Sequence, residues 1–303
     1  MSQKLQKPDF ICVGLPKAGT STLHHVLDQH RDVSMPPVKE LKYLINDQLN
    51  YHSPRLFSMM SQEWPAKQDA AFLYRCLKSP GTWLSSSYQR RSVLNYYFGL
   101  RANDEWYRSL FDENKVSGDI TVNYFWLSAE ECRDLAQRFP HAKIIFMLRS
   151  PVDLHWSFFR MIALKNGQRD ALEMQQFSEH IENKKRIMGR YRDLVMRWRD
   201  AFSPDQVYVG FFDELKTDPT GFYTGICNYL GIAGPDDWSE DMRGALSKVV
   251  NNSPKMEVPG DLAQPIIDLS RTNLDDFEEI SPDYHRKWQD DIQAFERSVL
   301  ETS

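Results

Sequence analysis

The chain has 303 residues, of which 41% are hydrophobic and 26% charged, and this composition excludes a disordered or fibrous protein. A chain of this length can bury a large core in one α/β domain or in two smaller ones. The formal net charge of −5 argues against a nucleic-acid partner or an anionic membrane surface. It leaves room for a small anionic ligand that is bound by a few donors.

Cysteine and histidine spacing predicts no metal site and no disulfide framework. The four cysteines are far apart in the sequence, and the eight histidines show no ligand-like spacing. No apolar run approaches the roughly 18 residues of a membrane span, and the run at 10–15 is too short for a signal-peptide core. We therefore expect a cytoplasmic protein.

The first predicted elements are a strand and a helix joined by a short loop. Residues 9–15 form a continuous apolar run between two prolines, which is typical of a strand buried on both faces. Residues 20–30 carry apolar side chains at helical spacing, and Thr20 or Ser21 is placed to cap the first helical turn.

The segment from about 45 to 112 is an aromatic-rich insertion without a sustained period. We expect short helices and loops that pack over the main sheet, followed by a second strand at 115–121. The aromatic side chains could line an acceptor pocket or belong to the core, and we favour the core. They are Trp64, Phe72, Tyr74, Trp83, Tyr88, Tyr96, Tyr97, Phe98, Trp106, Tyr107 and Phe111.

The second half of the sequence alternates strands and helices. Residues 142–148 are the clearest buried strand, and the next helix begins at about Asp153. Strands that alternate with helices predict an α/β fold, with a mostly parallel central sheet flanked by helices, in a single domain over 1–303. The further predicted elements are an amphipathic helix at 177–202, a strand at 207–212, a helix at 222–230 that ends at Gly231, a loop-rich segment at 232–281 and a final helix at 284–300.

The sequence GLPKAGTST, which starts at Gly14, is typical of a loop that binds a phosphate. Gly14 and Gly19 allow close approach of the backbone, and the N–H groups of residues 18–22 would face an anion at the positive end of the helix dipole. The two glycines have the spacing of the nucleoside-triphosphate loop, but Thr20 stands at the lysine position and Lys17 lies three residues earlier. A triphosphate with magnesium needs the later lysine, which argues against a kinase. The alternative is an ordinary strand-to-helix turn with a solvated lysine.

A second candidate phosphate contact follows the strand at 142–148. Arg149 lies at the carboxyl end of that strand, where open α/β sheets bind ligands. Ser157 lies in the following helix, and an arginine together with a serine hydroxyl could hold a second phosphate. The alternative is that Arg149 pairs with a nearby carboxylate such as Asp153.

Together these segments resemble the PAPS-dependent sulfotransferase superfamily, whose donor is 3′-phosphoadenosine 5′-phosphosulfate (PAPS). PKAGTST at 16–22 is similar to the family's loop for the 5′-phosphosulfate, and RSPVDLHWS at 149–157 is similar to its 3′-phosphate motif. PPVKELKYL at 36–44 resembles the segment that carries a catalytic glutamate in the glycan-type branch, and GDITVNYF at 118–125 resembles the family's acidic strand and turn. The match covers about residues 9–232.

The resemblance implies a P-loop NTPase-like fold, PAPS as the donor and no metal. It implies that Lys17 stabilises the leaving 5′-phosphate and that Arg149 and Ser157 bind the 3′-phosphate. Glu40 takes the place of the general base, a role that usually contributes about 10²–10⁴-fold, and Lys42 would orient it. The residues that would hold the 5′-phosphate are Lys17, Ala18, Gly19, Thr20, Ser21 and Thr22.

Two positions depart from the glycan-type pattern. Lys42 stands where that branch often has a histidine, and Ile120 stands where it often has a lysine beside the acidic residue. The chain could therefore be a small-molecule kinase or a non-catalytic nucleotide-binding protein of the same fold, and Glu40 with Lys42 could be a solvated charge pair. Small-molecule, carbohydrate, lipid and peptide acceptors all stay open, as does the oligomeric state. Residues 251–255 could belong to a loop that closes over the nucleotide.

Overall fold

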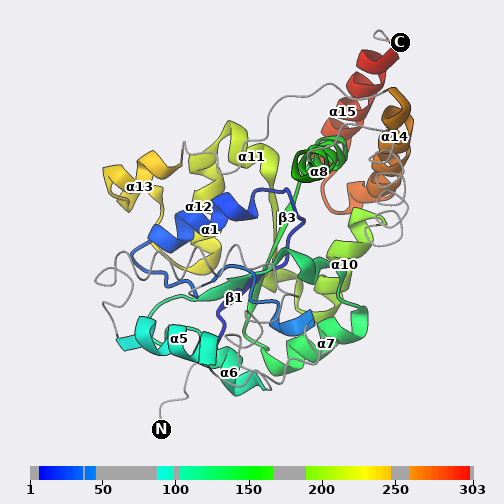
Figure 1. Ribbon diagram of the computed structural model, residues 1–303. Helices are drawn as coiled ribbons and strands as arrows, with labels where there is room; N and C mark the ends of the chain where they lie inside the picture. The colour runs from blue at the N-terminus through cyan, green and yellow to red at the C-terminus, as the bar shows by residue number, and fades with distance from the viewer. Residues whose placement is uncertain are drawn as a thin grey trace.

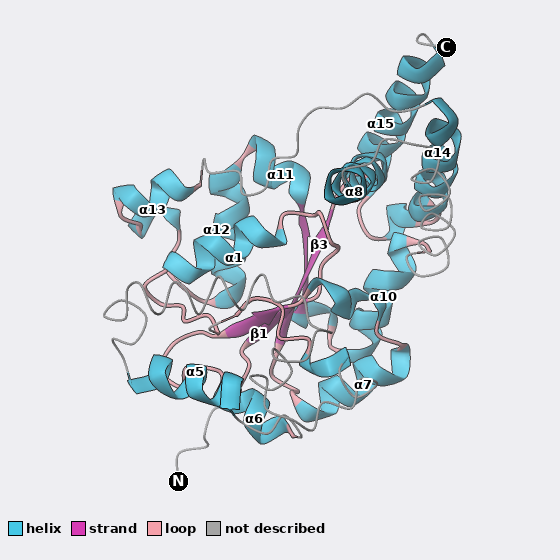
Figure 2. Ribbon diagram, viewed as in Figure 1, coloured by secondary structure: helices cyan, strands magenta, loops and turns pink. Residues whose placement is uncertain are grey.

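The computed structural model describes residues 7–36, 38–45, 87–98, 103–166, 189–246 and 260–300. Within this part of the chain, four parallel strands form one sheet in the order β2-β1-β3-β4. Figure 2 shows helices on both sides of the sheet, which confirms the predicted α/β architecture. The strands are β1 (Phe10–Cys12), β2 (Gly118–Ile120), β3 (Lys143–Leu148) and β4 (Val207–Phe211).

The helices are, in chain order, α1 (Thr20–Gln29), α5 (Ser87–Phe98), α6 (Asp104–Ser109), α7 (Ala129–Arg138), α8 (Pro151–Asn166), α10 (Tyr191–Ala201), α11 (Phe212–Thr217), α12 (Pro219–Leu230), α13 (Glu240–Ala245), α14 (Gly260–Leu274) and α15 (Pro282–Leu300). Short 3₁₀ helices join them, among them η2 (Val122–Trp126), η3 (Pro204–Gln206), η4 (Pro235–Asp237) and η5 (Phe277–Glu279).

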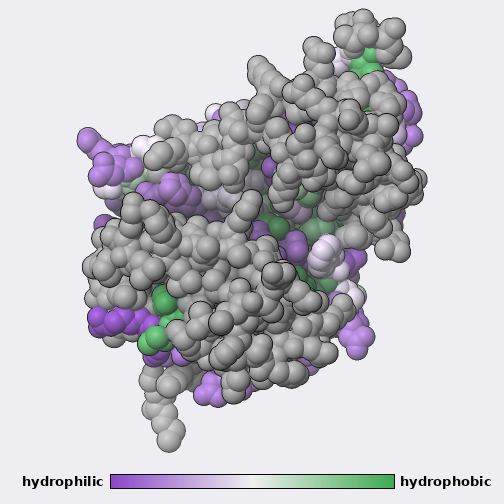
Figure 3. Space-filling view, in the orientation of Figure 1, coloured by the Kyte–Doolittle hydropathy of each residue, from purple (hydrophilic) through white to green (hydrophobic). Residues whose placement is uncertain are grey.

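Different helices cover the two faces of the sheet. Figure 1 shows α1 and α12 on one side and α6, α7 and α10 on the other. The helices α8, α14 and α15 pack against one another. Hydrophilic side chains gather over α1 and α13 on the face shown in Figure 3. No helix in the described ranges has the length and apolar character needed to cross a membrane.

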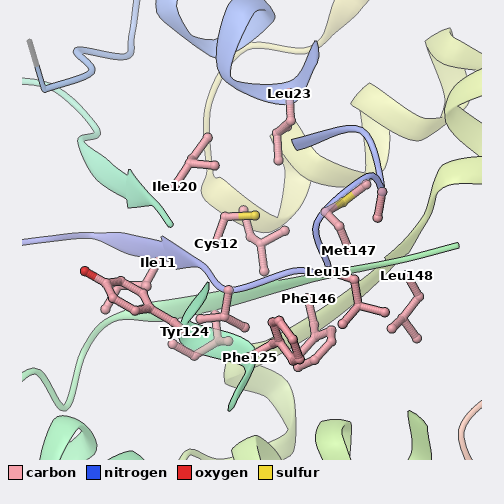
Figure 4. Close-up of a cluster of buried hydrophobic side chains, with 14 of the residues drawn as sticks. Ile11, Cys12, Leu15, Leu23, Ile120, Tyr124, Phe125, Phe146, Met147 and Leu148 are labelled. Atoms are coloured by element: carbon pink, nitrogen blue, oxygen red, sulfur yellow. The ribbon is translucent and has the colours of Figure 1, made fainter. Parts of the chain in front are cut away.

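Strand β1 is buried on both faces, as its continuous apolar run predicts. It pairs in parallel with β2 and β3, so that Phe10 lies between Gly118 and Lys143. Figure 4 shows Leu23 of α1 on one side of β1 and Phe125 of η2 on the other. Apolar side chains thus cover both faces, which explains why the sequence of this strand does not alternate between apolar and polar residues.

Most predicted elements are present with slightly shifted ends. The helix α12 ends at Gly231, whose φ of 76° is the left-handed conformation typical of a helix end. The predicted cap of α1 is wrong, because Gly19 precedes the helix and no side chain caps it. Thr20 and Ser21 already belong to the first helical turn, whereas a capping residue must stand before it.

The helix predicted at 177–202 starts later than expected. Gly189 has a φ of 49° and Arg190 is extended, so α10 begins at Tyr191. Residues 167–188 lie outside the described ranges. The apolar period of the sequence continues past Gly189, but the left-handed backbone at this glycine does not fit inside a helix.

The segment predicted as loop-rich at 232–281 contains two helices, α13 and α14, so that prediction is wrong. Pro265 lies inside α14, and because proline disfavours the interior of a helix, the sequence did not predict a helix here. Leu262, Ile266 and Leu269 are nevertheless buried at helical spacing. Their packing against α8 and α15 outweighs the local preference of proline.

The aromatic-rich insertion is described in part, through α5 and α6 and the residues that follow them. Tyr96, Trp106, Tyr107 and Phe111 are buried in the hydrophobic core, which confirms the core interpretation for these four residues. The aromatic residues between 64 and 83 lie outside the described ranges, as does the predicted closing loop at 251–255.

Candidate functional site

The candidate site starts where β1 ends. The N–H groups of Val13 and Leu15 donate to the carbonyl oxygens of Ile145 and Met147 at 2.9 and 2.8 Å, so the chain keeps its pairing with β3 beyond the strand. A Cβ atom at Gly14 would lie 2.4 Å from the backbone nitrogen of Met147, so a glycine is required here. The loop that follows therefore begins at the carboxyl end of β3.

This loop turns sharply into α1. Lys17 and Gly19 have positive φ values of 68° and 84°, and a Cβ atom at Gly19 would lie 2.6 Å from the ring of Phe212. Because α1 starts at Thr20 without a side-chain cap, its first turn presents N–H groups that have no helical acceptor. These groups and the positive end of the helix dipole fit a bound anion.

Two of the N–H groups predicted to face the anion are used by the loop itself. The N–H of Ala18 donates to the carbonyl of Leu15 at 3.2 Å, and the N–H of Thr22 donates to the carbonyl of Gly19 at 2.9 Å. Both bonds close the turn, which the sequence interpretation did not anticipate. Residues 19–21 begin the helix, where N–H groups have no acceptor in a preceding turn, so their N–H groups are the candidates for binding an anion.

Lys39 is a residue of the site that the sequence interpretation missed. Its ammonium group donates to Ser21 Oγ at 2.9 Å and to Thr20 Oγ1 at 3.4 Å, and it lies 3.8 Å from Glu40 Oε1. Burial lowers the pKa of Lys39, although the nearby Glu40 carboxylate acts in the opposite direction. The only signal in the sequence was a second lysine beside Glu40, and a loop has no periodicity that shows which lysine points at the phosphate loop.

Glu40 and Lys42 lie in a strained segment beside Lys39. Their φ values are 62° and 57°, in the left-handed region that residues other than glycine rarely adopt. Four non-glycine residues of the described chain have a positive φ, and three of them are Lys17, Glu40 and Lys42. Such strain is concentrated at functional sites, which makes this coincidence informative.

The Glu40 carboxylate lies between two ammonium groups. Lys42 Nζ lies 3.9 Å from Glu40 Oε2, opposite the contact that Lys39 makes with Oε1. The Glu40 side chain is 22% exposed, so the pair with Lys42 is partly buried and differs from the freely solvated pair of the alternative interpretation. The carboxylate stays accessible to a molecule that approaches from solvent.

Arg149, the second candidate phosphate contact, is hydrogen-bonded to the phosphate loop. Its Nη1 donates to the carbonyl oxygen of Lys17 at 2.9 Å, and its Nη2 donates to Asp153 Oδ2 at 3.0 Å, so the alternative pairing is present as well. The guanidinium carbon lies 4.7 Å from the ring centroid of Phe212. The buried Nε has no hydrogen-bond partner among the described residues, which leaves one donor for a ligand.

Asp153 and Ser157 lie in the first two turns of α8. Burial alone would raise the pKa of Asp153, but the charges of Arg149 and Lys216 outweigh this effect and lower the pKa. The carboxylate is therefore ionised at neutral pH and holds the Arg149 side chain in place. Ser157 is buried, and within the described part of the chain it makes no bond to Arg149 or to the phosphate loop.

The thiols of the described chain are poor candidates for chemistry. Cys12, Cys132 and Cys227 are free and buried, and burial raises the pKa of each to about 12, which keeps them as unreactive thiols. Among the residues that the structure describes, no group of three or more histidine, cysteine or acidic side chains could hold a metal ion.

Known proteins resemble this chain in sequence over most of its length. The model of the Sulfotransferase family matches residues 8–237. The bifunctional heparan sulfate N-deacetylase/N-sulfotransferase 1 of Xenopus laevis is 22% identical over 251 residues, which cover 78% of this chain and 23% of that protein. The protein of the same name from Caenorhabditis briggsae is 27% identical over 154 residues, covering 46% and 17%. The chain thus spans about a fifth of the length of these curated relatives.

Solved structures show the same fold. A sulfotransferase from Alicyclobacillus acidocaldarius superposes with a TM-score of 0.59 at 21% identity, covering 90% of this chain and 95% of that one. The sulfotransferase domain of the Synechococcus PCC 7002 olefin synthase gives 0.50 at 15% identity, covering 90% and 96%. These likenesses confirm the predicted P-loop NTPase-like sulfotransferase fold.

Proposed function

This chain belongs to the Sulfotransferase family, and we propose that it transfers a sulfuryl group from PAPS to a hydroxyl or amine of an acceptor. The observation that carries the proposal is a pair of linked donor groups, which we take as the two ends of one anion site. The uncapped first turn of α1 forms one end, and the unpartnered Nε of Arg149 forms the other. The bond from Arg149 to the Lys17 carbonyl links them. A nucleotide with phosphates on both its 5′ and 3′ positions suits such a site, whereas ATP carries a single phosphate chain.

The first end of the site has the donors that a 5′-phosphate requires. The N–H groups of residues 19–21 would hold it, and the ammonium groups of Lys17 and Lys39 would balance its charge. When bound, PAPS supplies an activated sulfuryl group, and the phosphate oxygen that it leaves gains negative charge. Positive groups that are fixed in advance favour this transition state over the ground state. Arg149 would bind the 3′-phosphate, and we assign Ser157 to the same group on the family resemblance.

We assign Glu40 the role of general base, whose carboxylate takes the proton from the acceptor hydroxyl or amine. Two ammonium groups flank this carboxylate at 3.8 and 3.9 Å and orient it, and Lys42 acts through this contact. The Lys39 ammonium also touches Ser21, so the base and the phosphate loop share one cation. A base in this position would stand beside the phosphate from which the sulfuryl group departs.

The acceptor class is a further part of the proposal. The names of the sequence relatives point first to an amine or hydroxyl of a carbohydrate. Small-molecule, lipid and peptide acceptors belong in the same screen. The kinase alternative has less support, because Thr20 stands where a triphosphate loop carries its lysine.

Thermal unfolding in the presence of nucleotides tests the proposal. PAP, the desulfated product of the donor, at 100 times its Kd should stabilise the protein by about 2.7 kcal/mol, which raises the midpoint by several degrees. We expect this shift without metal, followed by transfer of labelled sulfate from PAPS to an acceptor. A shift only with ATP and magnesium would favour the kinase. A shift with PAP but no transfer to any acceptor would favour the non-catalytic nucleotide-binding protein.

A further inference from the structure

The side chain of Asp119 in β2 is almost fully buried, and the chemistry assigned above does not use it. Its Oδ1 accepts a hydrogen bond from Thr121 Oγ1 at 2.8 Å, and its Oδ2 accepts from the hydroxyl groups of Tyr124 at 2.8 Å and Tyr107 at 3.1 Å. The backbone of Leu41 lies near this carboxylate and, like these bonds, lowers its pKa. Three hydroxyl groups therefore donate to one buried carboxylate, which satisfies its charge.

Two of these hydroxyl groups also hold residues 40–44, which we call the Glu40 loop. The N–H of Lys42 donates to Thr121 Oγ1, and the N–H of Leu44 donates to the Tyr124 hydroxyl oxygen, both at 3.4 Å. Each hydroxyl thus donates to the buried carboxylate and accepts from the loop. The direction of these bonds matters, because a hydroxyl has one proton to give.

Strand β2 itself holds the start of the Glu40 loop. The N–H of Glu40 donates to the carbonyl of Ile120, the last residue of the strand, at 3.2 Å. Glu40 and Lys42 both have a positive φ, and the side chain of Leu41 between them is 1% exposed. A strained backbone of this kind persists only where its surroundings hold it in place.

We propose that Asp119 is a positioning residue for Glu40. An ionised carboxylate can only accept hydrogen bonds, so Thr121 and Tyr124 must donate to it and turn their lone pairs towards the Glu40 loop. The loop is thereby fixed in its strained shape, and the Glu40 carboxylate is held at one distance from the phosphate loop. The catalytic consequence rests on the proposed function, whereas the hold on the loop does not.

The protonation of Asp119 should control this hold. Burial raises the pKa of Asp119 to about 6, although its hydrogen bonds act in the opposite direction. Tyr107 of α6, Tyr124 of η2 and Cys12 of β1 are the titratable groups that face it, and burial raises the pKa of all three, so they stay neutral near pH 6. The ammonium group of Lys39 acts against burial at Cys12 and lowers the pKa of its thiol. Protonated Asp119 must donate one bond, which forces a hydroxyl to turn and weakens the hold on the loop.

Two isosteric variants test the hold without removing the buried carboxylate. Tyr124→Phe removes a hydroxyl that accepts from Leu44, whereas Tyr107→Phe removes a hydroxyl that donates to the same Oδ2 and keeps the ring that stacks on Tyr43 of the Glu40 loop at 4.5 Å. Amide hydrogen exchange of the free protein at pH 7.5 should be about fivefold faster at Leu44 in Tyr124→Phe, which corresponds to the loss of one ordinary hydrogen bond. Tyr107→Phe should stay within about twofold of the wild type at this amide. Equal rates in the two variants would overturn the proposal, whatever the activity of the protein.

The same pair of variants then tests the catalytic consequence. Tyr124→Phe should lower kcat about fivefold with little change in KM for PAPS, and Tyr107→Phe should keep the wild-type kcat. The difference in Leu44 exchange rate between Tyr124→Phe and Tyr107→Phe should shrink below about pH 6, where Asp119 is protonated. When both variants also carry Asp119→Asn, which imitates the protonated state, this difference should be independent of pH. Faster exchange with unchanged kcat would overturn the positioning role. Absence of transfer in the wild type itself would count against the proposed function, and the exchange experiment would then decide the hold on its own.

Discussion

Replacing Lys39 with methionine should separate the stability of the fold from its affinity for nucleotide. Lys39→Met keeps an unbranched side chain of similar length and removes the charge. Burial lowers the pKa of Lys39, so the folded state disfavours the charged form. This cost is fully present at neutral pH and disappears as the pH rises towards the ordinary lysine pKa. The free energy of unfolding of Lys39→Met at pH 7 should therefore be no lower than that of the wild type.

The affinity for PAP should change in the opposite sense. The Lys39 ammonium lies 2.9 Å from Ser21 Oγ at the first turn of α1, within reach of an anion bound there. A hydrogen bond from a charged donor contributes about 1.5–3 kcal/mol, which corresponds to roughly 10- to 150-fold in Kd. Titration calorimetry with PAP at fixed salt measures this change, and urea unfolding of the same samples measures stability.

Lys42→Met is the matched control for this experiment. Lys42 also approaches Glu40, but from the other carboxylate oxygen, and we place no phosphate contact on it. Its affinity for PAP should stay within about twofold of the wild type, because a partly exposed ion pair contributes little. An unchanged Kd in Lys39→Met would refute the assignment of this lysine to the anion. An equal loss of affinity for PAP in both variants would indicate a general effect of charge and no specific contact of Lys39 with the anion.

Three further predictions concern the loop, the base and the buried carboxylate. Gly19→Ala should lower the free energy of unfolding by about 2–4 kcal/mol in urea, since the positive φ and the contact of 2.6 Å with Phe212 both oppose a Cβ atom. Gly231→Ala has a similar φ but open space, so equal losses would contradict the steric part. Glu40→Gln should lower turnover about 10²–10⁴-fold with the Kd for PAP unchanged, and full turnover would exclude this base. The raised pKa of Asp119 means that the folded chain binds more protons than the unfolded chain between about pH 4 and 6. Stability should rise by up to about 3 kcal/mol as the pH falls through this window, and a rise that persists in Asp119→Asn would contradict this reasoning.

The central sheet and the phosphate loop could be predicted from local sequence because local contacts determine them. Strand β3 lies between β1 and β4 and is buried on both faces, so its sequence is a continuous apolar run. Gly14 and Gly19 are required by contacts of 2.4 and 2.6 Å that leave no room for a Cβ atom. The position of Arg149 followed from the end of β3 alone. These features each depend on a few neighbouring residues whose types are visible in the sequence.

The direction of the Lys39 side chain could not be predicted in this way. It depends on the left-handed backbone at Glu40 and Lys42, which contacts from Ile120 and Thr121 hold in place across some 80 positions of sequence. Tertiary packing likewise determines α14, where Pro265 locally disfavours a helix. The roles of Glu40 as base and Ser157 as phosphate ligand stay predictions. Both roles concern contacts with a bound molecule, and contacts within the protein do not test them.

The bond from Arg149 to the Lys17 carbonyl has a consequence for the kinetics of binding. It fixes a left-handed loop residue in the free protein, together with the two N–H bonds that close the turn. The conformational entropy of this loop is therefore lost during folding, before any nucleotide arrives. Nucleotide would meet a site that is already shaped, so diffusion and orientation should limit the association rate, with no slow rearrangement of the loop.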